Sequence, residues 1–316
     1  DFNPFQERRE NLSILISDER AHAQFYNNIG AEYYGNGDAA TALSLGAATP
    51  ASTALLTDDV LGQQIQKMPI TNIVVQGEVE TTATNTDRVY IKASADFGET
   101  PSTGLIALIR ANDSWKLRSA FLNARDPGHG IGTTGRAVDT LEIGGQPVGD
   151  SGVVAVFPGA WNLSTTNPFL DVSPPPPLLL DRLQYGAQSN VFSPVFSLND
   201  TGKQAIRATI TKWVTDCFIP GGATPAGPCD LIEPTRGGTY LPGTARLDGP
   251  MVLEQWAFSL DQSLKVLVSV GDVHIPFTAE RPAGTVENSV WRYIVTPVDI
   301  SKNPPVVMPP GPHRLG

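Results

Sequence analysis

The sequence predicts an α+β fold in which helices pack on curved antiparallel sheets, as two such domains plus a small β module. In each half of the chain, apolar residues recur first at three- and four-residue spacings and then at every second position. Helices followed by a meander of strands are typical of helices that cover one face of an antiparallel sheet. The 30 glycines and 27 prolines among 316 residues indicate that many turns join short elements.

The first predicted domain covers residues 1–124 and begins with helices. The first helix spans residues 5–34, with apolar positions Leu12, Leu15, Ile16, Phe25, Ile29 and Tyr33. Asp38 is placed to cap a short alanine-rich helix. The sequence Thr57-Asp58-Asp59 is placed to cap another, which Pro69 ends.

Four strands complete this domain because the apolar period then changes to two. Their apolar positions are Ile73, Val75 and Val79, then Val89 to Ala95, Leu105 to Ile109, and Trp115 to Ser119. The sequence Ala111-Asn112-Asp113-Ser114 predicts a turn, so the last two strands form an antiparallel hairpin.

Residues 125–173 are expected to form the small β module after a glycine-rich linker. Its short strands are predicted at Thr140–Ile143, Val153–Phe157 and Ala160–Leu163. Pro174–Pro177 open a proline-rich spacer, residues 174–185, because consecutive prolines favour an extended polyproline II segment.

The C-terminal domain is predicted at residues 186–302 and repeats the order of helix and strands. Asn199-Asp200 caps a helix with one apolar stripe, namely Ile206, Ile210, Trp213, Val214 and Cys217. Strands follow at Gly238–Leu247, Met251–Leu260, Leu264–Val270, Val273–Phe277 and Val286–Val295. Gly271-Asp272 is expected to be a tight turn. The proline-rich tail, residues 303–316, lies extended on a neighbour or is loose.

Cys217 and Cys229 are the only cysteines, and we expect them to form a disulfide. The eleven residues between them are rich in glycine and proline, so this segment can fold back on itself. A single pair placed around such a loop favours an oxidising compartment, although two reduced thiols of a cytosolic protein are the alternative. A zinc site would need further ligands, and no histidine lies near this loop.

The acidic composition excludes some partners. A net charge of −10 and a pI near 4.8 argue against nucleic acid and against an anionic membrane surface. The longest apolar runs are far shorter than the ~18–20 residues of a membrane-spanning helix. The sequence begins at Asp1 without methionine, so we expect any membrane contact to come only through an N-terminal anchor that precedes it.

The order of elements, together with two short motifs, resembles extracytoplasmic cell-envelope proteins of actinobacteria. The motifs are Val156-Phe157-Pro158-Gly159-Ala160-Trp161, and Thr215-Asp216-Cys217 with Gly227-Pro228-Cys229 downstream. Such proteins are lipoproteins or singly membrane-anchored, with NTF2-like or cystatin-like α+β domains. The resemblance implies an extracytoplasmic location and another envelope or surface protein as partner, and it supplies no catalytic residue.

Two patterns could indicate an enzyme. Gly149-Asp150-Ser151-Gly152 looks like the nucleophile loop of chymotrypsin-type proteases, but no suitable histidine and aspartate precede it, so we interpret it as a hairpin turn. Some NTF2-like domains use an acid and a phenol for proton transfer. Candidates for that pair are Tyr26, Tyr33, Tyr34, Asp38 and Asp96.

We predict no catalytic, cofactor-binding or metal-ligating residue. The four histidines, His22, His129, His274 and His313, have no metal-binding spacing. No phosphate-binding or dinucleotide-binding glycine motif occurs in a suitable setting. His274 lies in a predicted strand and is expected on its polar face.

The sequence therefore favours a non-catalytic extracytoplasmic binding or accessory protein of a bacterial cell envelope. A structural subunit of a surface filament, virion or membrane complex is one alternative. An enzyme with an NTF2-like pocket is the other.

The disulfide gives a direct test of the compartment. Closing the Cys217–Cys229 loop is expected to stabilise the fold by roughly 3 kcal/mol through lost chain entropy. Cys217→Ser should therefore lower the melting temperature, and reductant should lower that of the wild type equally. Identical wild-type melting temperatures with and without reductant would contradict the disulfide.

Overall fold

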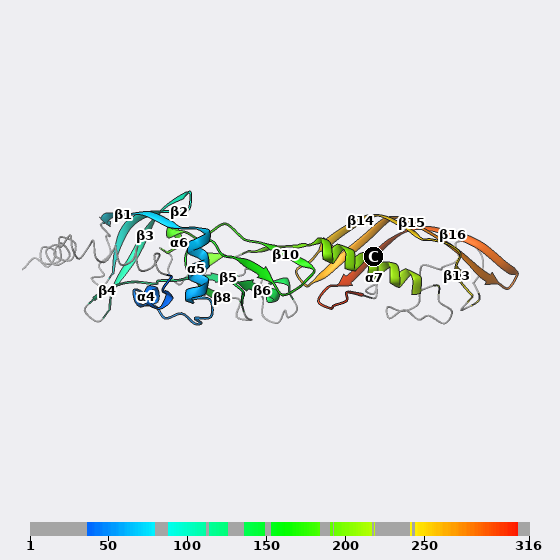
Figure 1. Cartoon of the computed structure of the whole chain (residues 1–316), viewed down its shortest axis with the longest axis horizontal. Helices are drawn as coiled ribbons and strands as arrows, with labels where there is room; N and C mark the ends of the chain where they lie inside the picture. Colours follow the sequence, from blue (N-terminus) through cyan, green and yellow to red (C-terminus); the bar gives the residue numbers. More distant parts are fainter. Residues whose placement is uncertain are drawn as a thin grey trace, which may run out of the picture. The chain divides into compact units, whose positions relative to one another are not determined.

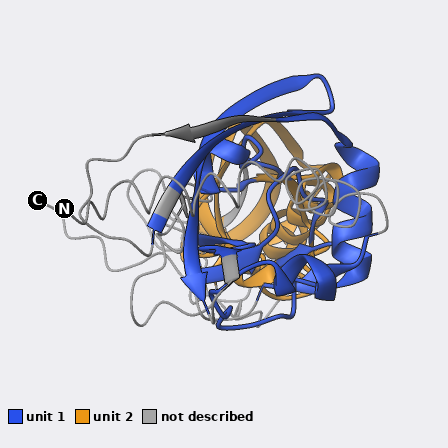
Figure 2. Cartoon of the chain, turned by 90° about the vertical axis from the view of Figure 1, so that its left-hand side faces the viewer, with its two compact units in different colours: residues 1–133, 141–164, 173–195 blue, residues 134–140, 165–172, 196–316 orange. Residues whose placement is uncertain are grey.

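The structure is a computed structural model that mixes helices with a larger number of strands, mostly in curled antiparallel sheets. It describes residues 37–79, 88–111, 114–125, 136–148, 153–183, 190–191, 193–216, 218, 241 and 244–308. Contacts divide the chain into two compact units, coloured in Figure 2. Unit 1 comprises residues 1–133, 141–164 and 173–195, and unit 2 comprises residues 134–140, 165–172 and 196–316.

Unit 1 contains a four-stranded antiparallel meander. Its strands, in spatial and sequence order, are β1 (Ile70–Val79), β2 (Arg88–Phe97), β3 (Thr100–Ala111) and β4 (Ser114–Leu117). Ala111 pairs with Ser114, as the predicted hairpin requires. All four strands of the first predicted domain are therefore confirmed.

Two short helices of unit 1 begin at the predicted caps. Helix α4 (Ala39–Ser44) starts after Asp38, whose Oδ1 accepts a hydrogen bond from the Thr41 amide at 2.9 Å. Helix α5 (Asp58–Lys67) starts after Thr57, whose Oγ1 accepts from the Val60 amide at 3.3 Å. Both predictions are confirmed, since each side chain satisfies an amide that the first helical turn leaves without a partner.

The apolar core of unit 1 joins α4 and α5 to residues of β4 and of a second sheet. That sheet has the order β11 (Asn190–Val191), β5 (Leu122–Arg125), β8 (Val153–Val156). The buried members of the core are Ala39, Ala42, Leu56, Leu61, Leu117, Ala120, Phe121, Ala155 and Phe157.

The segment predicted as a β module contributes to both units. Strands β6 (Leu141–Ile143), β7 (Gln146–Pro147) and β9 (Leu163–Thr165) form a small sheet, and residues 141–164 group with unit 1. An independent module therefore stays a prediction. The strand expected at Ala160–Leu163 is wrong, because only Leu163 of that range lies in a strand, at the start of β9. The Trp161 indole donates back to the Phe157 carbonyl at 3.2 Å.

The predicted spacer contains a helix. Helix α6 (Leu180–Leu183) packs on β3, where the Leu180 amide donates to Ser102 Oγ at 3.2 Å. A Cβ at Gly104 would lie 2.6 Å from the Leu180 carbonyl oxygen, so glycine allows this approach. Residues 180–183 are thus part of unit 1 and not of a free spacer.

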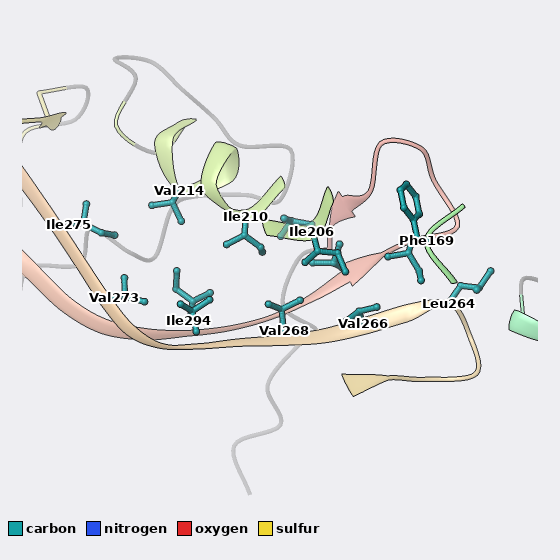
Figure 3. Packing of buried hydrophobic residues seen from close by; sticks show 14 of the residues in the cluster. Phe169, Ile206, Ile210, Val214, Leu264, Val266, Val268, Val273, Ile275 and Ile294 are labelled. Carbon is teal, nitrogen blue, oxygen red and sulfur yellow. The ribbon is translucent and has the colours of Figure 1, made fainter. Parts of the chain in front are cut away.

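Unit 2 is built on helix α7 (Asp200–Asp216), which lies on the concave side of a curved sheet (Figure 1). Asn199 caps it, since its Oδ1 accepts from the Gly202 amide at 2.8 Å. The predicted stripe faces the sheet, and the side chains of Ile206, Ile210 and Val214 are fully buried (Figure 3). The helix and its cap are confirmed.

The sheet of unit 2 is antiparallel, with long central strands. Its members are β13 (Arg246–Leu247), β14 (Val252–Leu260), β15 (Lys265–Arg281), β16 (Gly284–Asp299) and β17 (Val306–Val307). Strand β15 pairs with β13 and β14 on one side and with β16 on the other, and β17 pairs with the end of β16. A separate pair, β10 (Leu170–Ser173) and β12 (Val195–Leu198), packs near the start of α7.

The turn predicted at Gly271-Asp272 is wrong, because β15 is continuous there. Between Val270 and Val273 the register advances three residues on β15 but two on β16, so β15 carries a β-bulge. Burial shows the same slip: even-numbered residues face the core up to Val270, and odd-numbered ones from Val273. Glycine and aspartate therefore mark a bulge and not a strand end.

Part of the predicted tail belongs to this sheet. Val306 and Val307 pair with Asp299 and Val298, and Val307 is buried in the core of unit 2. Residues 309–316 lie outside the described part of the chain, as do half of the residues of the strand expected at Gly238–Leu247.

Two helical glycines give opposite predictions. A Cβ at Gly202, in the first turn of α7, would lie 2.5 Å from the Phe169 carbonyl oxygen and 2.8 Å from a Leu198 methyl. Gly202→Ala should destabilise unit 2 by about 1–3 kcal/mol through overpacking.

The matched control is Gly62→Ala in α5, where nothing lies within 4 Å of the new Cβ. It should stabilise unit 1 by about 0.5–1 kcal/mol, because alanine loses less backbone entropy than glycine. Urea unfolding of both variants would measure the two effects, and a harmless Gly202→Ala would refute the close approach of α7 to Phe169.

Candidate interaction surface

The acid proposed for a proton-transfer site has a structural role. Both Asp38 oxygens bind Thr41: Oδ2 accepts from its hydroxyl at 2.6 Å and Oδ1 from its amide at 2.9 Å. The hydroxyl bond, followed by the amide bond, lowers the pKa of Asp38 below its ordinary value. A general acid that works near neutral pH needs a raised pKa instead, so Asp38 acts as a helix cap.

The other proposed site residues are not brought together in the described part of the chain. Asp96 lies on β2, and its Oδ2 accepts from Asn72 Nδ2 at 2.6 Å on the exposed surface. The three tyrosines of the proposed site, Tyr26, Tyr33 and Tyr34, lie outside the described residues.

Of the remaining candidate residues from the sequence, the structure describes only His274. His274 is half-buried on β15 between the buried Val273 and Ile275, so its side chain lies on the opposite face from the core. The other histidines, the Gly149–Gly152 motif and both cysteines lie outside the described residues, and the disulfide stays a prediction. Among the residues that the structure describes, no three metal-ligating side chains gather.

An exposed apolar surface on unit 2, which sequence reasoning missed, is the strongest candidate site. Along β15, Val266, Val268 and Val270 point into the core, so Leu267 and Ser269 point outward. Across the sheet, Leu267 pairs with Pro297 and Ser269 with Val295. On the other side of β15, Leu267 pairs with Ser259 and Ser269 with Ala257 of β14, so the outward face brings residues of three strands side by side.

We call this surface the neutral strip. Its residues are Ala257, Ser259, Leu267, Ser269, Tyr293, Val295 and Pro297, from β14, β15 and β16. Leu267 is 50% exposed, Val295 53% and Tyr293 75%. None of its residues carries a charge, and the cross-strand neighbours Lys265 and Asp299 lie beyond one end.

The strip is unusual because a sheet packed on one face normally presents polar side chains on the other. A signal was present in the sequence, since Val266-Leu267-Val268 and Ile294-Val295 place apolar residues at consecutive positions. Such runs indicate a strand with two apolar faces.

A second cluster, of one exposed cation and two half-buried aromatic rings, joins α7 to β14. The Arg207 guanidinium lies 5.8 Å from the Trp256 ring centre and 5.7 Å from that of Phe258. The two rings are stacked, with their centres 6.2 Å apart. An exposed cation over aromatic rings contributes about 0.5–1 kcal/mol, so this cluster helps to hold the helix to the sheet.

Comparisons with protein-family models, with curated proteins and with solved structures found no match. Within the described residues, none of the helices has the length and apolar character needed to cross a membrane.

The role of Asp38 predicts a pH effect. Because its folded pKa is lowered, its carboxylate stabilises the fold above the ordinary value of 3.8, and this contribution disappears as the pH falls through the folded pKa. Asp38→Asn keeps a capping oxygen but cannot titrate.

The difference in unfolding free energy between wild type and Asp38→Asn should therefore shrink from pH 6 to pH 3. Asp38→Ala, which removes the cap at every pH, is the control. Urea unfolding across this range measures both variants. A difference that grows on acidification would contradict the lowered pKa.

Proposed function

We propose that the chain is a non-catalytic extracytoplasmic binding or accessory protein of a bacterial cell envelope. In this proposal two α+β domains and a β module present a binding surface to another envelope or surface protein. The neutral strip on unit 2 is the observation that supports it best.

The strip has the character of a binding surface. Contiguous exposed apolar side chains are rare on soluble monomers and often mark interaction sites. Tyrosine is enriched at interfaces, and charged residues are depleted at their centres, as in this strip.

The structural role of Asp38 supports the non-catalytic part of the proposal, because the acid proposed for catalysis is held as a carboxylate by Thr41. The extracytoplasmic part is supported by the cysteine pair around a glycine- and proline-rich loop and by the resemblance to envelope proteins.

Labelling of cysteines introduced one at a time, with the labelling of the wild-type chain and its Cys217 and Cys229 subtracted as background, tests the proposal in the intact bacterium. Ser259→Cys places a thiol in the neutral strip with little change in size, and Glu99→Cys places one on an exposed turn of unit 1. A maleimide that cannot cross membranes should label Glu99→Cys at the same rate on whole cells and on purified protein. Ser259→Cys should be labelled several-fold more slowly on cells, because a partner covers the strip.

Each alternative outcome contradicts one part of the proposal. Glu99→Cys that reacts only after lysis would place the chain inside the cytoplasm. Ser259→Cys that reacts equally fast on cells and in purified protein would leave the strip without a partner.

A further inference from the structure

Strand β16 has a long edge that the described residues leave open. On one side it pairs with β15 from Gly284 to Asp299. On the other side it pairs with β17 only at Val298 and Asp299, and the Met308 amide donates to the Pro297 carbonyl at 2.9 Å. From Gly284 to Thr296 no described residue pairs with this side.

The backbone groups on this edge can be assigned. The Pro297 carbonyl points toward β17, away from β15. Alternate residues of a strand direct their amide and carbonyl to the same side. The amides and carbonyls of Tyr293 and Val295 therefore point to the open edge. Because a row of such groups is a template for another strand, native sheets usually block it.

The other long edges that the described residues leave open are irregular, whereas β16 is regular. Strand β1 has two register shifts, and Asn72 has a φ of 53°. Strand β14 contains Gln255 with a φ of 54°. Within the described residues, β16 has a positive φ only at Gly284, in its turn, and the nearby bulge residue belongs to β15. Irregularities of this kind discourage pairing, and β16 lacks them.

Strand β17 shows how a segment fits this edge. Val307 points inward and is 8% exposed, while Val306 points outward and is 43% exposed. The chain's own sequence is poorly suited to extend this ladder, because Pro309, Pro310 and Pro312 have no amide hydrogen. Within the part of the chain that the structure describes, the edge beyond β17 is thus open to another segment.

Charge favours a different protein over a second copy. Two copies would bring together chains of net charge −10, which disfavours self-association. The exposed Tyr293 and Val295 lie on the edge strand itself, so an added strand would place its own outward side chains about 4.5–5.5 Å from them.

We propose that the β16 edge from Gly284 to Thr296 binds an extended, neutral or basic segment of the partner protein as an added antiparallel strand. This inference rests on the proposed function and names its mode of recognition. Backbone hydrogen bonds would give affinity, and apolar side chains next to Tyr293 and Val295 would give specificity.

The experiment combines Ser259→Cys labelling on cells with two substitutions at one edge position. Val295→Pro removes an amide that points to the open edge and leaves the β15 ladder intact, as the natural Pro297 does two residues away. Val295→Ala removes most of the side chain but keeps that amide. Melting temperatures of the purified variants confirm that both remain folded.

We call the slower labelling of Ser259→Cys on cells than in purified protein its protection. We expect Val295→Pro to abolish this protection, so that both labelling rates become equal. We expect Val295→Ala to keep most of it. Protection that survives Val295→Pro, or that both variants abolish equally, would overturn strand addition while leaving the proposed function standing. If Ser259→Cys with the natural Val295 is labelled equally fast on cells and in purified protein, the proposed function itself is refuted.

Sedimentation of the purified chain tests whether the strand added at the β16 edge comes from a different protein or from a second copy of this chain. A wild-type monomer is expected over a wide concentration range. A dimer that Val295→Pro dissociates would overturn the proposal, because a second copy would then be the strand that fills the edge.

Discussion

The packing of one helix stripe on one sheet face determines the organisation of unit 2. Ile206, Ile210 and Val214 lie one turn apart on α7 and are fully excluded from water by the valines and isoleucines of β15 and β16. Burial of these side chains fixes which face of each strand is inward. The positions of the neutral strip on the other face follow from it, because successive side chains of a strand alternate between faces.

The sequence predicted best those features that depend on neighbours along the chain. The caps at Asp38, Thr57 and Asn199 needed only a side-chain oxygen and an amide two or three residues ahead, and all three are present. Gly271-Asp272 was misinterpreted because glycine and aspartate suit turns and bulges alike. Pairing with β16, whose residues come later in the chain, decides between the two, and local sequence does not contain that information.

The candidate surface was harder to predict for the same reason. Leu267, Ser259 and Val295 are far apart in sequence, and only the register of β14, β15 and β16 makes them neighbours. The open edge of β16 depends on where β17 stops pairing. The residues proposed for catalysis, in contrast, were chosen by type, and the structure gives Asp38 a capping role that explains it equally well.

The β-bulge also limits how this protein can change over evolution. It divides β15 into two halves. In the first half even-numbered residues face the core, from Val266 to Val270, and in the second half odd-numbered residues do, from Val273 to Ala279. Loss of one residue inside either half would turn the valines between that point and the bulge toward water. Loss of one residue at Gly271-Asp272 would instead remove the bulge: β15 would then advance two residues between Val270 and Val273, as β16 does, and both halves would still face the core. Length variation within either half of β15 should therefore occur in steps of two residues, whereas a single residue can be lost at Gly271-Asp272 without turning either half away from the core.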